Sequence, residues 1–325
     1  MFQIQRLEQI VGRDRIRSEE PLSEHTTFRI GGPAKWYVEA DTTEELVLIV
    51  RYLREQREPY HILGNGSNVL VEDAGIDGVV VCTHNGRGGS LESVGCFTEE
   101  QEMRRFFYDQ GYCVPEEVQG RILLYAGGGA LLSQIASQAA KESLTGLEFA
   151  GGIPGTLGGA VTMNAGAYGG EIQDVIVAAR ILDQNGIVKI LKKEELELGY
   201  RSSIIQRENM LVLDALFALE PGEEQQIRAT MKDYNERRRE KQPLEYGSAG
   251  STFKRPEGYF AGKLIQDAGL RGYRVGDVMV SEKHCGFVVN VGQGNCEQAK
   301  QVIEHVQKTV FEQFGVELET EIKVW

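Results

Sequence analysis

The chain of 325 residues lacks the long apolar runs that would cross a membrane. A membrane helix needs about 20 consecutive apolar residues, and residues 211–219 come closest without approaching that length. The start, MFQIQRLEQIVGRDRIR, alternates charged and apolar residues and has no continuous apolar segment of the signal-peptide type. We therefore expect a cytoplasmic protein with no membrane partner.

Positive charge and paired cysteines are also scarce. Lysine and arginine number 35 against 48 acidic residues, for a formal net charge of -13. A nucleic-acid backbone needs a basic face that neutralises phosphates, so no nucleic-acid partner is expected. The five cysteines are odd in number and form no CxxC pair, and no two histidines have metal-ligand spacing. Free thiols and no metal site are expected.

The common nucleotide-binding fingerprints are missing as well. In the pattern G-x-G-x-x-G, Val69 takes the last glycine position after Gly64, and Leu132 takes it after Gly127. No glycine cluster is followed by GK[ST], and G-x-S-x-G does not occur. These absences exclude a Rossmann fingerprint, a P-loop and the nucleophile elbow of hydrolases.

Glycine, in contrast, is abundant at 39 of 325 residues, about 12% against a usual ~7%. Two long clusters, at 64–68 and 151–170, mix glycine with small polar residues. Bare loops of this kind expose successive backbone N–H groups that bind a pyrophosphate, and Ser67, Asn68 and Thr156 can add side-chain contacts. The alternative is that the glycines serve only tight turns. Two such clusters favour a large phosphate-bearing ligand.

Strands, glycine turns and helices alternate along the chain, which predicts an α+β or α/β fold in two or three units. A capping box begins a helix at Thr42, and a short helix is expected at 99–109. Asn185-Gly186 between two strands predicts a type I′ hairpin.

The last third changes character after Pro221-Gly222. A polar helix at 223–241 leads into a new unit, so we place a domain boundary near residues 219–223. A helix at 297–314 is capped by Asn295 and stopped by Gly315. The alternating pattern at 318–324 predicts a half-buried strand.

Seven segments share their order with the motifs of one enzyme family. TTFRIGG at 26–32, GNGSNVL at 64–70 and GLEFAGGIPGTLGGAVTMNAGAYGG at 146–170 resemble the flavin-binding half of the UDP-N-acetylenolpyruvoylglucosamine reductase family. YRSS at 200–203, GSTFK at 250–254, SEKH at 281–284 and LETE at 318–321 resemble its later motifs. Each short motif is weak alone. The ordered set covers about residues 22–323 and is specific.

The resemblance implies an α+β fold. It implies a two-lobed FAD-binding domain of vanillyl-alcohol-oxidase type over 1–220, with lobes of about 1–82 and 83–220, and a smaller α+β substrate domain over 221–325. FAD is the implied cofactor and NADPH the implied co-substrate. The implied reaction reduces a UDP-sugar, UDP-N-acetylglucosamine enolpyruvate, to UDP-N-acetylmuramate in peptidoglycan precursor synthesis. No obligatory protein partner is implied.

The resemblance also implies which residues bind the cofactor. They lie in the two glycine clusters: Gly64, Asn65, Gly66, Ser67, Asn68, Ile153, Pro154, Gly155, Thr156 and Gly166.

Three catalytic side chains are implied by the same motifs. Arg201 is expected to hold the substrate carboxylate, because a guanidinium is always charged and binds carboxylates in bidentate fashion. Ser251 is expected to donate a proton to the substrate α-carbon. Glu321 is expected to point into the cleft, where desolvation and a facing carboxylate would raise its pKa, so that the neutral acid could donate a hydrogen bond. The alternatives are a surface salt bridge, an ordinary loop serine and an exposed strand glutamate.

Three further residues are implied to bind the substrate. Lys241 is expected at its diphosphate, whereas the adjacent arginines 237–239 can form a solvated helix face. Tyr168 and Asn290 are expected to line the cleft, and packing and a strand-end cap are equally good explanations of them.

Two features differ from the family pattern. Gly127-Gly128-Gly129-Ala130 stands where the family reads Gly-Ala-Gly-Ala, and the segment 81–127 is longer and richer in glycine. Residues 219–237 leave no room for an extra tyrosine-bearing loop, so the chain resembles the branch that lacks it. Two other functions stay open: an alcohol or sugar oxidase or dehydrogenase on the same FAD fold, and a flavin- or nucleotide-sugar-binding module without turnover.

Overall fold

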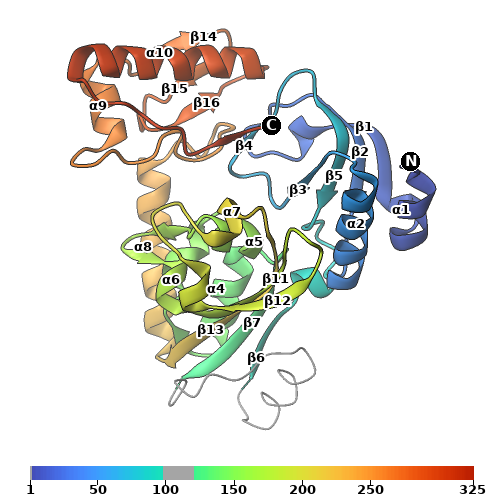
Figure 1. The fold of residues 1–325 in the computed structure, drawn as a ribbon. Helices are drawn as coiled ribbons and strands as arrows, with labels where there is room; N and C mark the ends of the chain where they lie inside the picture. The colour runs from blue at the N-terminus through green and yellow to red at the C-terminus, as the bar shows by residue number, and fades with distance from the viewer. Residues whose placement is uncertain (1, 98–120) are drawn as a thin grey trace.

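The computed structural model describes residues 2–97 and 121–325. Figure 1 shows three bodies: an N-terminal lobe in blue, a second lobe in green and yellow, and a C-terminal domain in orange and red. The helix predicted at 99–109 lies outside the described residues. In the described part of the chain, no helix is both long and apolar enough to cross a membrane.

The first lobe is built on a mixed four-stranded sheet in the order β1-β2-β5-β3. β1 pairs with β2 antiparallel, and β5 pairs with β2 and β3 in parallel. The capping box predicted at Thr42 is confirmed, since its hydroxyl accepts from the Glu45 N–H and the Glu45 carboxylate accepts from the Thr42 N–H. The elements are α1 (Ile4–Val11), β1 (Ile16–Pro21), β2 (Pro33–Glu39), α2 (Thr43–Gln56), β3 (Tyr60–Leu63), β4 (Val69–Leu70) and β5 (Ile76–Cys82).

The second lobe has a central antiparallel sheet in the order β12-β11-β13-β7-β6, with β8 paired to β13. Leu182 and Leu213 of this sheet are buried in the same apolar cluster as the first-lobe helices α1 and α2, so the two lobes share a core. Its strands are β6 (Val94–Phe97), β7 (Ile122–Gly127), β8 (Leu144–Thr145), β9 (Gly166–Ala167), β10 (Gly170–Glu171), β11 (Ile176–Leu182), β12 (Val188–Lys192) and β13 (Leu211–Pro221). Its helices are α4 (Leu132–Lys141), the 3-10 helix η4 (Glu148–Gly152), α5 (Leu157–Thr162), α6 (Ile172–Val175) and α7 (Ile204–Arg207).

The long helix α8 (Glu224–Lys241) leads from the second lobe into the C-terminal domain (Figure 1). The predicted domain boundary therefore falls between β13 and α8. In the C-terminal domain, α10 packs on a three-stranded antiparallel sheet in the order β14-β15-β16. Its elements are α9 (Ala261–Asp267), β14 (Arg274–Val275), β15 (Val278–Val280), β16 (Val288–Asn290) and α10 (Cys296–Phe314).

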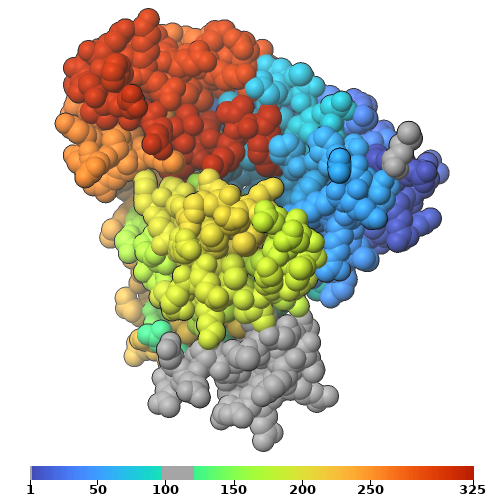
Figure 2. Space-filling model, in the orientation of Figure 1, coloured from blue at the N-terminus to red at the C-terminus, as the bar shows by residue number. Residues whose placement is uncertain are grey.

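The last residues return to the first lobe. β17 (Lys323–Val324) pairs in parallel with β4, and the Trp325 carbonyl accepts from the Glu72 N–H at 2.8 Å. Phe28 and Ile30 of the first lobe are buried in the core of the C-terminal domain. Figure 2 shows the red C-terminal atoms lying directly against the blue lobe. The chain thus runs from the first lobe through the second lobe to the C-terminal domain, and its last residues pair with the first lobe again.

A first-lobe side chain also caps α10. The Asp73 carboxylate accepts from the N–H groups of Cys296 and Glu297 at 2.7 and 3.1 Å. The predicted cap Asn295 accepts from the Gln298 N–H at 2.9 Å, and the helix ends at Gly315 with a φ of 67°. These bonds satisfy N–H groups that have no partner inside the helix.

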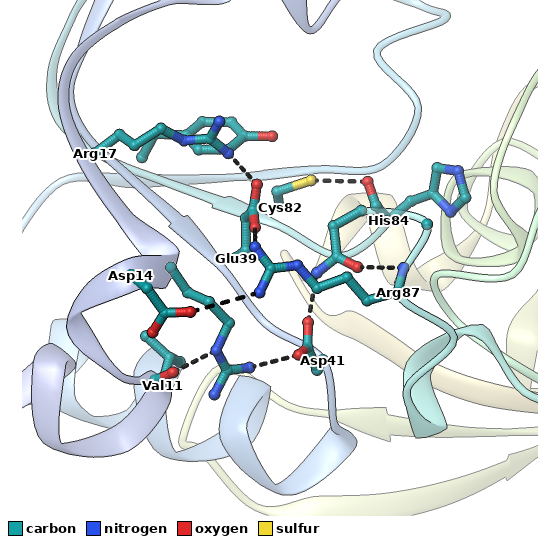
Figure 3. A network of polar contacts seen from close by, with 12 residues as sticks. Val11, Asp14, Arg17, Glu39, Asp41, Cys82, His84 and Arg87 are labelled. Carbon is teal, nitrogen blue, oxygen red and sulfur yellow. Dashed lines mark hydrogen bonds and ion pairs between the residues drawn. The ribbon is translucent and has the colours of Figure 1, made fainter.

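A network of polar contacts lies beside β2 in the first lobe (Figure 3). The buried Glu39 carboxylate pairs with Arg17 on β1 and with Arg87 on the loop after β5, the latter at 2.7 Å. Arg15 pairs with Asp41 at 3.0 Å and with Glu45 at 2.6 Å. A buried carboxylate between two guanidiniums has its charge compensated, so this network ties the loop after β5 to the sheet.

Two local predictions are wrong. The Asn185-Gly186 hairpin exists, but its turn is not type I′, because only Gly186 has a positive φ. The Asp183 carboxylate accepts from the N–H groups of Asn185 and Ile187 and shapes a longer loop. The strand predicted at 318–324 is regular only at β17, because the preceding residues pair individually with the 252–254 segment.

Removing the cap on α10 should destabilise the protein. Asp73→Ala leaves two helix N–H groups without their acceptor, so we expect the free energy of unfolding to fall by about 1–2 kcal/mol in urea denaturation. Asp77→Ala is the matched control, because Asp77 is largely exposed and, within the described residues, pairs with Lys35 alone. We expect its effect to stay below about 0.5 kcal/mol. Equal losses in the two variants would contradict the role of the cap.

Candidate functional site

The two glycine clusters of the sequence come together in the fold. The 64–68 loop follows β3, and the 153–156 loop joins η4 to α5. The Asn65 side-chain amide donates to the Pro154 carbonyl at 2.7 Å. A Cβ at Gly64 would lie 2.3 Å from Thr156 Oγ1, so Thr156 occupies the position that a side chain of residue 64 would need.

Glycine is required at the turn of the first loop. Gly66 has a φ of 60°, and a Cβ there would lie 2.1 Å from the His25 carbonyl oxygen. The Thr27 N–H donates to the Gly66 carbonyl at 3.0 Å, so the 26–32 motif supports the loop from behind. Both the backbone angle and the close approach exclude a side chain at Gly66.

The two loops offer unsatisfied hydrogen-bond donors. Within the described residues, no acceptor is found for the backbone N–H groups of Asn65, Gly66, Ser67, Gly155 and Thr156. Consecutive N–H groups on a bare loop form an anion-binding concavity. The pair of loops therefore fits the diphosphate of a dinucleotide such as FAD.

The other glycines have local explanations. A Cβ at Gly166 would lie 2.7 Å from both Glu171 Cβ and the Gly170 oxygen across the β9–β10 hairpin. A Cβ at Gly129 would lie 1.8 Å from the Thr83 oxygen. In these two places glycine is needed for backbone packing, which was the alternative for the glycine clusters. Contact of Gly166 with FAD stays a prediction.

Arg201 and Glu321 meet, although 120 positions separate them in the chain. Arg201 Nε donates to Glu321 Oε1 at 2.5 Å, and the two side chains are only 20% and 13% exposed. Arg201 has a φ of 52°, in the left-handed region that non-glycine residues adopt rarely. A half-buried pair of this kind holds a fixed cation beside a carboxylate.

Ser251 lies on the segment that runs beside Glu321. The Glu321 N–H donates to the carbonyl of the next residue, Thr252, at 2.8 Å. Ser251 itself is exposed and follows Gly250, whose φ is 79°. Its hydroxyl has no hydrogen-bond partner among the described residues. The fold therefore brings all three predicted catalytic residues to one region.

This region also adjoins the first glycine loop. Asn68 Nδ2 donates to the Glu321 carbonyl at 3.2 Å, and the Lys323 N–H donates to the Asn68 carbonyl at 2.9 Å. From the second lobe, Tyr200 Oη accepts from the Arg255 N–H at 3.0 Å. All three bodies thus contribute backbone or side chains to one site.

Burial raises the pKa of Glu321, while the neighbouring charges of Arg201 and Lys254 lower it. The raised pKa agrees with the sequence prediction. Its cause is burial, because the charged groups that act on Glu321 are two cations rather than a facing carboxylate. Lys254 itself pairs with Glu319 at 2.8 Å, on the exposed side of the segment.

The predicted substrate-binding residues have mixed surroundings. Lys241 is exposed at the end of α8, and the Tyr168 ring stacks on Tyr234 with centroids 4.4 Å apart. The Asn290 amide donates to the carbonyls of Phe28 and Arg29, and its oxygen accepts from two backbone N–H groups. Asn290 is buried, and these contacts favour the cap over direct substrate binding.

The sequence pattern did not distinguish Arg238 from its neighbours. Arg238 lies in the run 237–239, which was interpreted as a solvated helix face, yet its Nε is buried without a partner. Helical periodicity does not distinguish it, because the apolar pattern of α8 is weak and only Ile227 is buried. Among the described residues, no group of three or more His, Cys, Asp or Glu could hold a metal ion.

Comparison with known proteins defines the class and then the family. One family model, described as an FAD binding domain, matches residues 116–192. A second, described as UDP-N-acetylenolpyruvoylglucosamine reductase, C-terminal domain, matches residues 242–325. An FAD-binding domain joined to a reductase domain defines an FAD oxidoreductase.

The chain is 49% identical to the UDP-N-acetylenolpyruvoylglucosamine reductase of Lachnoclostridium phytofermentans, over 99% of this chain and 96% of that one. It is 45% identical to the one of Caldanaerobacter subterraneus, over 99% and 97%. The crystal structure of the Thermus caldophilus reductase superposes with a TM-score of 0.74 at 33% identity, covering 95% and 99%. The chain belongs to the UDP-N-acetylenolpyruvoylglucosamine reductase family, and the predicted α+β fold with an FAD-binding domain is confirmed.

Adding a methyl group between the two loops should weaken FAD binding. In Gly64→Ala, Thr156 cannot rotate away, because its Cγ2 and Cβ would also lie within 3.3 Å of the new carbon. We expect the dissociation constant for FAD to rise about tenfold or more, the usual effect of overpacking, when the apoprotein is titrated with FAD. Gly95→Ala is the control, since its Cβ would meet nothing within 4 Å. Full FAD affinity in Gly64→Ala would exclude close contact of the loops.

Proposed function

We propose that this protein reduces UDP-N-acetylglucosamine enolpyruvate to UDP-N-acetylmuramate in peptidoglycan precursor synthesis, with NADPH as the reductant. Membership of the reductase family supports the substrate. The observation that carries the proposal is the Arg201–Glu321 pair, which lies beside Ser251 and next to a glycine loop that fits FAD.

FAD would be held by the N–H groups of the 64–68 and 153–156 loops and, once reduced by NADPH, would supply hydride, which side chains do not store. The substrate is an enolpyruvyl ether, CH2=C(OR)–COO⁻. Hydride would add to its methylene carbon, and the electron pair of the double bond would move to the α-carbon and its carboxylate. A proton then completes the product, CH3–CH(OR)–COO⁻. The protein must stabilise that charge and deliver that proton.

Arg201 would bind the substrate carboxylate. Its guanidinium is fixed by the bond from Nε to Glu321, and Nε occupies only one of its donor positions. The remaining N–H groups can bind a second carboxylate in bidentate fashion. The charge that develops on the substrate would therefore meet a cation already in position.

Ser251 would donate the proton. A serine hydroxyl is a weak acid, so this step needs the strongly basic α-carbon opposite it. The exposed, unpartnered hydroxyl and the glycine before it let a substrate come close. Lys254, three residues on, places a positive charge near the segment, although Glu319 partly neutralises it.

Glu321 would hydrogen-bond the aci-carboxylate as a neutral acid. Burial already raises its pKa, and a substrate carboxylate on Arg201 would raise it further by like-charge repulsion. A protonated Glu321 donates a hydrogen bond where an ionised one would repel. Lys241 would bind the diphosphate of the UDP-sugar, and Tyr168 would lie beside it. NADPH and the UDP-sugar would occupy the site one at a time.

Replacing Ser251 should separate the two half-reactions. In Ser251→Ala we expect NADPH to bleach the flavin at the normal rate, whereas reoxidation by the enolpyruvyl substrate slows by about 10²–10⁴-fold, the usual contribution of a general acid. Both steps are followed by stopped-flow absorbance. Ser248→Ala, in the same loop, is the control and should leave both rates unchanged. Normal reoxidation in Ser251→Ala would remove Ser251 as the acid.

Substrate binding should be coupled to proton uptake. In the free protein the charges of Arg201 and Lys254 favour the ionised form of Glu321. With substrate bound, two carboxylates share Arg201, so the pKa of Glu321 rises and it takes up a proton. We expect uptake of up to one proton per site and tighter binding as the pH falls. Calorimetry near neutral pH, in two buffers of different ionisation enthalpy, measures this uptake. Glu321→Gln should bind without it, and a buffer-independent heat in the wild type would contradict the coupling.

A further inference from the structure

Three consecutive arginines in the last turns of α8 have different surroundings. Arg237 is exposed and pairs with Asp233 at 2.6 Å, and Arg239 is exposed. Arg238 is half-buried, and its Nε is shielded from solvent with no hydrogen-bond partner. Among the described residues, no carboxylate forms an ion pair with Arg238. The Arg238 guanidinium therefore has no carboxylate partner in the part of the chain that the structure describes.

The Arg238 side chain lies against the second glycine loop. A Cβ at Gly152 would be 3.4 Å from its Nη1 and 3.5 Å from its Cδ. Gly152 ends η4 and directly precedes the 153–156 loop. Burial lowers the pKa of Arg238, and the nearby Tyr168 hydroxyl opposes that shift. Tyr168 stacks on Tyr234, one turn earlier on α8.

A second unsatisfied atom lies one turn further on. Gln242 follows α8, and its side-chain Oε1 is buried without a partner. Gln242 lies four positions after Arg238, and its backbone N–H donates to the Arg238 carbonyl at 2.8 Å. A cation in the last turn also stabilises the helix dipole, but the exposed Arg239 and Lys241 already serve that purpose and need no burial. The dipole does not explain why Arg238 is buried and unpaired.

We propose that Arg238 binds a phosphate of the ligand that enters the cleft, with Gln242 accepting a hydrogen bond from the same ligand. This inference rests on the proposed function, which supplies two phosphate-bearing ligands, the UDP-sugar and NADPH. A guanidinium binds phosphate oxygens in bidentate fashion. Bound phosphate would compensate the charge of Arg238, which is shielded from solvent at Nε and has no carboxylate partner among the described residues.

The test compares Arg238→Gln and Arg238→Lys with the control Arg237→Gln. UDP and NADP⁺ are the probes, because their binding to the FAD-loaded protein needs no turnover, and it is titrated by calorimetry. We expect the dissociation constant of UDP, of NADP⁺ or of both to rise roughly tenfold to a hundredfold in Arg238→Gln, the usual loss for a hydrogen bond to a charged group. The affected probe identifies the source of the phosphate. Arg238→Lys should recover part of the affinity, and Arg237→Gln should bind normally.

The thermal midpoint of the unliganded protein separates ligand binding from a merely structural role. If Arg238 binds a ligand phosphate, Arg238→Gln should keep or raise this midpoint, because an unpaired buried charge is unfavourable. A merely structural role predicts a lower midpoint with unchanged affinity for both probes. Unchanged affinity for both probes, or loss of FAD alone, would overturn the proposal. If Arg238→Gln fails to fold, Gln242→Leu is titrated with the same probes, and normal affinity for both probes in that variant would overturn the proposal too.

A different result would distinguish this inference from the proposed function. A wild-type protein that binds UDP but does not reduce the enolpyruvyl substrate would refute the proposed function and leave this inference standing.

Discussion

Three backbone hydrogen bonds join residues 323–325 to residues 68–72, the segment that contains β4. The Lys323 N–H binds the Asn68 carbonyl at 2.9 Å, the Trp325 N–H binds the Leu70 carbonyl at 2.9 Å, and the Glu72 N–H binds the Trp325 carbonyl at 2.8 Å. Because Glu321 lies two residues before Lys323, this pairing sets it beside the 64–68 loop. The Asn68 side chain adds a bond to the Glu321 carbonyl at 3.2 Å, so backbone and side-chain bonds together hold Glu321 beside this loop.

The site is therefore a meeting point of three bodies rather than a pocket within one. Arg201 comes from the second lobe, Ser251 and Glu321 come from the C-terminal domain, and the glycine loop comes from the first lobe. The Arg201–Glu321 bond and the bond between Tyr200 and Arg255 hold the second lobe to the C-terminal domain. If Arg201 binds the substrate as proposed, the same guanidinium would hold the ligand and join two bodies, so that ligand binding and domain contact would depend on the same atoms.

The sequence allowed the helices and most strands to be predicted, because capping residues and apolar spacing act locally. Thr42 and Asn295 cap their helices as their patterns indicate. The prediction of a type I′ turn at Asn185 was wrong because the Asp183 carboxylate binds the N–H groups of the turn. The prediction of a continuous strand at 318–324 was wrong because tertiary pairing interrupts it. Family motifs indicated Arg201 and Glu321 as site residues, but the spacing alone does not show that two side chains 120 positions apart touch. The distinction among arginines 237–239 depends on what packs against α8, which no local pattern records.

The Asp73 cap has a consequence for how the molecule loses its structure. Asp73 belongs to the first lobe and α10 to the C-terminal domain, so the helix depends on a residue outside its own domain. Phe28 and Ile30, buried in the C-terminal core, create the same dependence. If the first lobe were cut away, the remaining polypeptide would still contain Arg201, Ser251 and Glu321. In it, α10 would lack the Asp73 carboxylate that accepts from two of its N–H groups, and the apolar core around Phe28 and Ile30 would be open to water. This part of the chain is therefore not expected to be an independent folding unit.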